Sequence, residues 1–128
     1  MEYYESLIAQ AIEARNASYS PYSKFAVGAA LLSENGSVFT GCNVENASYG
    51  LAICAERTAI CKAVSTGVQK FKVIAIAASP LASPCGACRQ SIVEFGTDIV
   101  VISVNADDPN ERKVWESGEL IPDCFRFE

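Results

Sequence analysis

The 128-residue sequence contains no histidine, and this absence removes several kinds of chemistry at once. Ser-His and Cys-His catalytic pairs are excluded, and so is every metal site that depends on an imidazole ligand. A zinc ion bound by this chain must therefore be held by thiolates or carboxylates. Thiolates are available, because the sequence has six cysteines.

Basic residues are also scarce. Ten Lys and Arg stand against fifteen Asp and Glu, which gives a formal net charge of −5 and an isoelectric point near 4.7. Proteins that bind nucleic acid usually present a basic face to the phosphates, and the sequence has no Lys/Arg cluster. We therefore expect neither nucleic acid nor an anionic membrane as a partner, and a neutral small molecule as the ligand.

Long apolar runs are missing too. None approaches the ~20 residues of a membrane-spanning helix, and the acidic start MEYYE lacks the basic and apolar regions of a signal peptide. We expect a cytoplasmic protein, in which a disulfide framework is not favoured. The sequence shows no repeat and no linker, so residues 1–128 are predicted to form one domain.

Hydrophobic periodicity predicts alternating helices and strands. The predicted helical segments cover residues 3–16, 52–65, 85–95 and a turn at 119–121. The predicted strands cover residues 25–32, 37–42, 72–78, 98–104 and a short edge strand at 113–116. A strand, helix and strand in that order imply a right-handed parallel crossover. The pattern predicts an α/β fold, a three-layer α/β/α sandwich with a mixed sheet of about five strands.

Two segments at predicted helix starts carry the chemistry: CAER at residues 54–57 and PCGACR at residues 84–89. Pro84 suits the first position of a helix, where its missing N–H has no partner. A helix N-terminus lowers the pKa of a thiol, because the helix dipole favours the anion. Cys54, Cys85 and Cys88 can thus supply three thiolates, which leave a fourth position for water, the arrangement of a catalytic zinc.

Glu56 lies two residues after Cys54, close enough to stand beside the metal without binding it. A carboxylate there can accept and return the proton of a zinc-activated water. Other interpretations exist for each feature alone. The Cys-x-x-Cys pair is also typical of a redox site or half of a structural zinc site, and Glu56 alone is typical of a solvated helix carboxylate. Those interpretations leave the combination of Cys54, Glu56 and the second motif unexplained.

Five segments resemble the zinc-dependent cytidine/deoxycytidylate deaminase family, and in particular its short homotetrameric cytidine deaminases. In chain order they are YSKFAVGA at residues 22–29, GCNVENASY at 41–49, CAER at 54–57, SPCGACRQ at 83–90 and ELIPDCF at 119–125. The similarity spans nearly the whole chain. One departure is the loop Ser79–Ser83, which is shorter than in the family and lacks an acidic residue near its start.

The resemblance implies an enzyme of pyrimidine salvage that hydrolyses cytidine and deoxycytidine to uridine and deoxyuridine with release of ammonia. It implies one Zn²⁺ per subunit, bound by Cys54, Cys85 and Cys88. Water activated by the zinc would attack C4 of cytosine. Glu56 would protonate N3, take the proton of the water and deliver it to the leaving amine.

The resemblance also implies the substrate contacts. Asn43 and Glu45 would bind the ribose 3′-hydroxyl, which agrees with their spacing, since residues two apart on a strand face the same way. Phe25 would pack on the nucleoside, and the N–H of Ala55 would contact the pyrimidine O2. The carbonyl of Ser83 would accept a hydrogen bond from the departing amine.

In a homotetramer of this kind, Ala47, Tyr49 and Phe125 would reach into the sites of neighbouring subunits, so that each active site is shared. Taken singly, Phe25, Tyr49 and Phe125 would be core aromatics, Asn43 a strand end and Glu45 an exposed carboxylate. The resemblance favours the substrate roles over these simpler assignments.

Three thiolates leave a bound Zn²⁺ with a formal charge of −1, which weakens its pull on the water. We expect Arg57 to offset this by donating hydrogen bonds to the sulfur ligands, although Arg57 and Arg89 are both also typical ion-pair partners. Arg89 is expected to be structural. The other cysteines, Cys42, Cys61 and Cys124, are expected to be ordinary buried or half-buried thiols.

Two alternative functions remain at the level of sequence. One is deamination of another aminonucleoside, such as blasticidin S. The other, of a different class, is a non-catalytic structural zinc module. The run Asn43-Val44-Glu45-Asn46 favours a plain nucleoside, and the absence of basic residues beside it disfavours a nucleotide.

Overall fold

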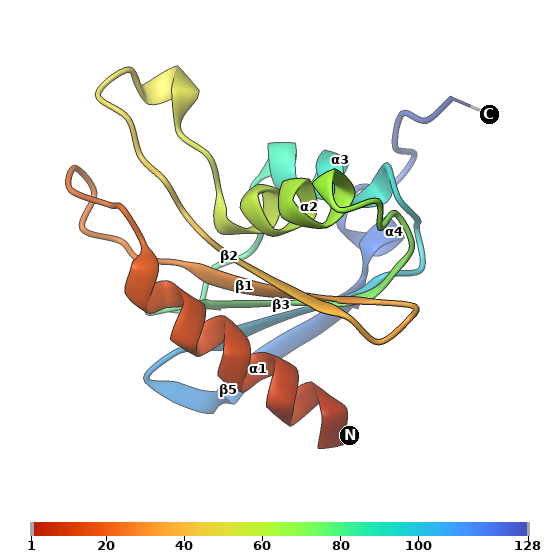
Figure 1. Cartoon of the computed structure of the whole chain (residues 1–128), viewed down its shortest axis with the longest axis horizontal. Coiled ribbons are helices and arrows are strands. Elements are labelled where there is room, and N and C mark those ends of the chain that lie inside the picture. The colour runs from red at the N-terminus through yellow and green to blue at the C-terminus, as the bar shows by residue number, and fades with distance from the viewer. Residues whose placement is uncertain (1, 128) are drawn as a thin grey trace.

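A five-stranded mixed sheet forms the middle layer of the computed structural model, which describes residues 2–127 (Figure 1). Its strands lie in the order β2-β1-β3-β4-β5. Their bounds are β1 Gly28–Ser33, β2 Val38–Cys42, β3 Phe71–Ala78, β4 Val100–Asn105 and β5 Asp108–Glu116. β3 and β4 are parallel and the other neighbouring pairs are antiparallel, so the sheet is mixed.

Helices cover both faces of this sheet (Figure 1). Their bounds are α1 Glu2–Ala14, α2 Ala55–Ser65, α3 Gly86–Val93 and α4 Ser117–Leu120, with 3-10 turns η1 Arg15–Ala17 and η2 Tyr49–Leu51. α1 lies against one face, and α2, α3 and α4 lie against the other. The predicted three-layer α/β/α sandwich is therefore confirmed.

The central strand β3 shows why the middle of the sequence is almost wholly apolar. Ile74 and Ile76 enter the core on the α2 side, whereas Val73 and Ala75 enter the core beneath α1. Each of these side chains is at most 3% exposed. From residue 73 onward the strand is buried on both faces and has no position for a polar side chain, which explains the run VIAIAA at residues 73–78.

Several predicted boundaries differ from the structure, and three of the differences have a clear physical reason. β5 begins at Asp108, because its polar run DPNERK forms an edge strand that pairs with β4 while its side chains face solvent. β1 begins at Gly28, after the backbone N–H groups of Phe25 and Val27 have bonded to side chains. α3 begins at Gly86 with Cys85 as its N-cap, so Pro84 lies before the helix and the prediction of a first helical position was wrong.

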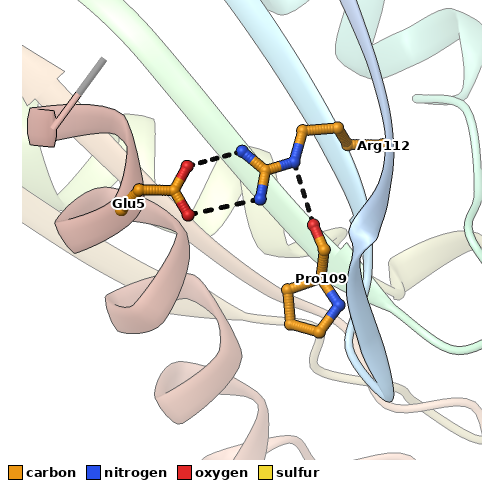
Figure 2. A network of polar contacts seen from close by, with 3 residues as sticks. All are labelled: Glu5, Pro109 and Arg112. Atoms are coloured by element: carbon orange, nitrogen blue, oxygen red, sulfur yellow. Dashed lines mark hydrogen bonds and ion pairs between the residues drawn. The ribbon is translucent and has the colours of Figure 1, made fainter.

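An ion pair ties the start of α1 to the edge strand β5. Figure 2 shows Arg112 gripping the Glu5 carboxylate through Nη1 at 2.7 Å and Nη2 at 3.3 Å, while its Nε donates to the Pro109 carbonyl at 2.9 Å. The pair lowers the pKa of Glu5 through the hydrogen bond from Arg112. The ion pair is exposed to solvent, so it adds little to the stability of the fold.

Within residues 2–127, no helix combines the length and the apolar character that crossing a bilayer requires.

Candidate active site

The starts of α2 and α3 bring three thiols together. Cys54 is the N-cap of α2, Cys85 is the N-cap of α3, and Cys88 lies in the first turn of α3. The sulfurs of Cys54 and Cys85 are 3.7 Å apart, and all three sulfurs lie within 4.8 Å of one another. The Cys85 sulfur also accepts the N–H of Cys88 at 3.4 Å, a capping bond that fixes its direction.

A close contact between α2 and the sheet sets the position of Cys54. A Cβ at Gly41 on β2 would lie 2.5 Å from the Ala59 nitrogen and 2.7 Å from the Ala55 oxygen. Only glycine lets the strand approach the first turns of α2 this closely. This contact sets the distance between β2 and α2, and with it the distance of Cys54 and Glu56 from the sheet.

The three sulfurs fit a zinc ion. Zn–S bonds of about 2.3 Å in a tetrahedron place sulfurs about 3.8 Å apart, close to the observed separation of Cys54 and Cys85. Three protein ligands leave one position open, which distinguishes a catalytic zinc site from a closed structural one. The ligand set is entirely thiolate, as expected for a chain without histidine.

The pKa values of two of the thiols reflect how closely their sulfurs contact one another. The hydrogen bond from Cys88 and then that from Arg57 lower the pKa of Cys54 to about 5, against the opposing effect of burial. The same contact with Cys54, together with burial, raises the pKa of Cys88 well above its ordinary value. One thiolate is thus stabilised by a neighbouring thiol that keeps its proton. A divalent cation held by the three sulfurs would take the place of that proton.

Arg57 contacts the sulfur of Cys54. Its Nη2 donates to the Cys54 sulfur at 3.7 Å. Its Nε is buried and has no hydrogen-bond partner among the described residues. A guanidinium in this place withdraws electron density from the thiolates.

Glu56 is nearly buried, at 4% exposure, and borders the same cavity as Cys54 and Cys85. Burial raises the pKa of its carboxyl group, and the charge of Cys54 adds to that effect. A carboxyl group in this environment can hold a proton as well as release one. That property is what a proton shuttle beside an activated water requires.

A cavity of about 280 Å³ opens over Cys54, Cys85 and Glu56. Four of the predicted substrate-binding residues line it: Phe25, Asn43, Glu45 and Ala55. Other lining residues are Val27, Ala52, Ile53, Ile76, Ala82 and Ser83. The walls are mainly apolar and the polar groups are few, which is typical of a site for a small heterocyclic ligand.

Asn43 has a single hydrogen-bond donor left for a ligand. Its Oδ1 accepts the Val27 N–H at 3.0 Å and the Ser18 hydroxyl, and its Nδ2 donates to the Phe25 carbonyl at 2.8 Å. An amide NH₂ carries two donors, so one remains free. The network fixes which way that donor points.

Glu45 offers the matching acceptor. Its Oε1 accepts the N–H groups of Tyr22 and Ser23 at 3.0 and 3.1 Å, and its Oε2 accepts the Ser23 hydroxyl. The Ser23 hydrogen bond lowers the pKa of Glu45, so the group is an ionised acceptor at neutral pH. A free amide donor next to a carboxylate acceptor suits a hydroxyl, which both donates and accepts.

The remaining predicted substrate contacts do not lie in this cavity. Ala47 is exposed, Tyr49 is 78% exposed, and Phe125 is 67% exposed with its ring 5.1 Å from that of Phe127. Figure 1 shows the C-terminal tail leaving the molecule at the end opposite to the 43–52 segment. Within one chain, these side chains are therefore not brought to Glu56.

Residues that orient the site were missed at the level of sequence. Ser18 and Ser23 hold Asn43 and Glu45, and Ile53 and Ile76 form cavity walls. Ser23 stands inside the quoted segment YSKFAVGA, which was the one available signal. A serine in a loop has no pattern that distinguishes a supporting hydroxyl from a solvated one.

The structure also tests the simpler assignments. Arg89 is structural, as predicted, because its Nε donates to the Pro84 carbonyl at 2.9 Å and its Nη1 to the Leu120 carbonyl at 2.8 Å. Cys42 and Cys124 are half-buried, but Cys61 is exposed, so the expectation of burial was wrong there. Cys61 lies on α2 and lines a surface pocket together with Ser91 of α3.

Residues 1–104 match the family model described as the cytidine and deoxycytidylate deaminase zinc-binding region. The chain belongs to the cytidine and deoxycytidylate deaminase family. Membership in this zinc-binding family, together with the Cys54, Cys85 and Cys88 cluster, makes zinc the cofactor of the chain. The predicted family and cofactor are thus confirmed.

Relatives in the deaminase family cover almost the whole chain. It is 54% identical to a cytidine deaminase of Halalkalibacterium halodurans over 97% of this chain and 95% of the relative. It is 49% identical to a cytidine deaminase of Sporosarcina psychrophila over 97% and 92% of the two chains. The crystal structure of cytidine deaminase from Burkholderia pseudomallei superposes with a TM-score of 0.89, at 45% identity over 94% of this chain and 98% of that one.

Similarity to a blasticidin-S deaminase of Bacillus cereus is weaker. That relative is 31% identical over 90 residues, which are 62% of this chain and 64% of the relative.

Proposed function

We propose that this chain is a cytidine deaminase, which hydrolyses cytidine and deoxycytidine to uridine and deoxyuridine and releases ammonia. The observation that carries the proposal is the placement of Glu56 beside three converging thiols, two of which, Cys54 and Cys85, line the same small cavity as Glu56. A non-catalytic zinc module needs neither a cavity nor a buried carboxyl group beside its metal. The cytidine deaminases at 54% and 49% identity support the choice of substrate.

Bound zinc would act as a Lewis acid and lower the pKa of a water to roughly 7. Glu56 takes one proton from the attacking water and delivers it to N3. It then takes the second proton, from the new C4 hydroxyl, and delivers it to the amine, so that ammonia leaves as the C4 carbonyl forms. Its burial removes competing solvent, so that proton transfer occurs within the cavity. Arg57 stabilises the thiolate ligands and limits the negative charge that they place on the metal.

The nucleoside is bound by groups of the cavity wall. Asn43 donates its free N–H to the ribose 3′-hydroxyl, and Glu45 accepts the proton of the same hydroxyl. Phe25 packs on the nucleoside, and the N–H of Ala55, at the start of α2, contacts the pyrimidine O2. The Ser83 carbonyl, which borders the cavity, accepts a hydrogen bond from the departing amine.

We further propose a cytoplasmic homotetramer in which subunits complete one another's sites, with residues 1–128 of each chain as a single domain. The support lies in side chains that are apolar yet exposed in one chain: Tyr49, Leu51 and Phe125 are between 65% and 78% exposed. Ala47, Tyr49 and Phe125 are the contributions to a neighbour's cavity. Burial of these surfaces between subunits would remove apolar area from water.

Ultraviolet absorbance during incubation with cytidine tests the proposal, because loss of the 4-amino group changes the chromophore. We expect cytidine and deoxycytidine to be consumed, with ammonia released in equal amount. Cytidine monophosphate, adenosine and blasticidin S serve as comparison substrates. Turnover of blasticidin S alone would instead support the alternative, and no turnover by a zinc-loaded protein would support a structural module.

A further inference from the structure

The hydroxyl group of Ser23 links Glu45 to the turn that carries Phe25 to the cavity. The Ser23 Oγ donates to Oε2 of Glu45 and accepts the N–H of Phe25 at 3.0 Å. Oε1 of the same carboxylate is held separately by the N–H groups of Tyr22 and Ser23. Two consecutive residues thus direct three hydrogen bonds at a single carboxylate.

The backbone between Ser23 and Phe25 adopts a conformation that needs support. Lys24 has φ of 61°, in the left-handed region that residues other than glycine seldom occupy. Its N–H donates to the Ser20 carbonyl at 3.1 Å. The Ser23 hydroxyl bridges this turn, because it contacts Phe25 on one side of Lys24 and Glu45 across the loop.

Solvent surrounds much of this contact, so packing does little to orient the carboxylate. Ser23 is exposed and Glu45 is half-buried. With the Ser23 hydroxyl removed, the two N–H bonds would still hold Oε1, but Oε2 would lose its protein partner. Oε2 would then be free to take up orientations that do not face a ligand.

We propose that Ser23 is a positioning residue for sugar recognition, whose hydroxyl orients the Glu45 carboxylate toward the 3′-hydroxyl of the nucleoside. The inference rests on the proposed function, since it takes Glu45 as the sugar contact. Ser23 itself touches no substrate. Its effect is expressed only where the substrate offers a hydroxyl for Glu45 to bind.

Steady-state kinetics with cytidine and 3′-deoxycytidine test this role in the full-length, zinc-loaded protein. Ser23→Ala is expected to lower kcat/KM for cytidine about threefold to tenfold, mainly through KM, because an exposed charge-assisted hydrogen bond contributes less than a buried one. With 3′-deoxycytidine the variant should match the parent protein. Ser23→Thr, which keeps the hydroxyl, should restore activity on cytidine.

Ser6→Ala is the matched control, because Ser6 is exposed on α1, where its hydroxyl accepts a hydrogen bond from Gln10 at 3.5 Å. Equal losses on both substrates in Ser23→Ala would mean that the hydroxyl supports the loop in general, and would overturn the proposal. Unchanged activity on cytidine would overturn it as well.

Glu45→Gln tests the sugar contact itself. This variant should lose kcat/KM for cytidine and not for 3′-deoxycytidine, and equal effects on the two substrates would remove the sugar role on which Ser23 depends. Failure of the proposed function itself is distinguishable, since the parent protein would then leave cytidine unchanged.

Discussion

Gly41 is the residue at which a single methyl group should displace the metal site. In Gly41→Ala the new Cβ would lie 2.5 Å from the backbone nitrogen of Ala59 and 2.7 Å from the backbone oxygen of Ala55. Neither atom belongs to a flexible side chain, so β2 and α2 must separate by about 0.5 to 0.9 Å to reach a tolerable contact. Overpacking of this kind costs about 1–3 kcal/mol of stability.

The same displacement moves Cys54 and Glu56 relative to α3, which carries the other two ligands. Zinc–ligand distances tolerate only about 0.2 Å of departure. We therefore expect Gly41→Ala to bind zinc more weakly and to lose on the order of 10² in kcat/KM, since misplacing reacting groups by about 1 Å has that effect. Zinc content of the purified protein and kinetics at saturating zinc measure the two effects.

Gly28→Ala supplies a matched control on the other face of the sheet. Its Cβ would lie 2.1 Å from the Ala11 oxygen and 2.6 Å from the Arg15 nitrogen, so the clash is at least as severe but falls on α1. This variant should lose stability while its folded fraction keeps zinc. If Gly41→Ala held zinc and turned over cytidine as Gly28→Ala does, the contact at Gly41 would not set the metal geometry, and the reasoning would be refuted.

Three further predictions concern the chemistry. Glu56→Gln should keep its zinc and lose about 10²–10⁴ in kcat, as measured by ammonia release, because the amide cannot shuttle a proton; wild-type turnover would contradict the assignment. Arg57→Ala should retain much of its zinc and lose activity, and unchanged turnover at full zinc occupancy would exclude Arg57 as a partner of the thiolates. Chelation of zinc should abolish deamination and lower Tm, and re-addition should restore both; activity that survives complete metal removal would refute the zinc mechanism.

Local sequence was sufficient for most of the helices and strands and for the candidate metal ligands. The apolar run of β3 and the helical spacing of α1 are set by which faces are buried, so their periodicity predicted them within a few residues. β5 was largely missed, because an edge strand with polar side chains has neither an apolar run nor a buried face. Pro84 was wrongly predicted as the first residue of α3. The start of this helix is set by the capping hydrogen bond that Cys85 accepts, and a proline alone does not reveal such a bond.

The sequence by itself determined the ligand types and the zinc-binding family. The absence of histidine left only sulfur or oxygen ligands, and the short spacings within CAER and PCGACR hold under any packing of the helices. Only the tertiary structure decided which donors remain free. The partners of Asn43 and Glu45 come from Ser18, Ser23, Phe25 and Val27, about 16 to 25 residues away in the chain. Hydrogen bonds over such separations depend on how β1, β2 and the loops before them pack, and no local pattern encodes that arrangement.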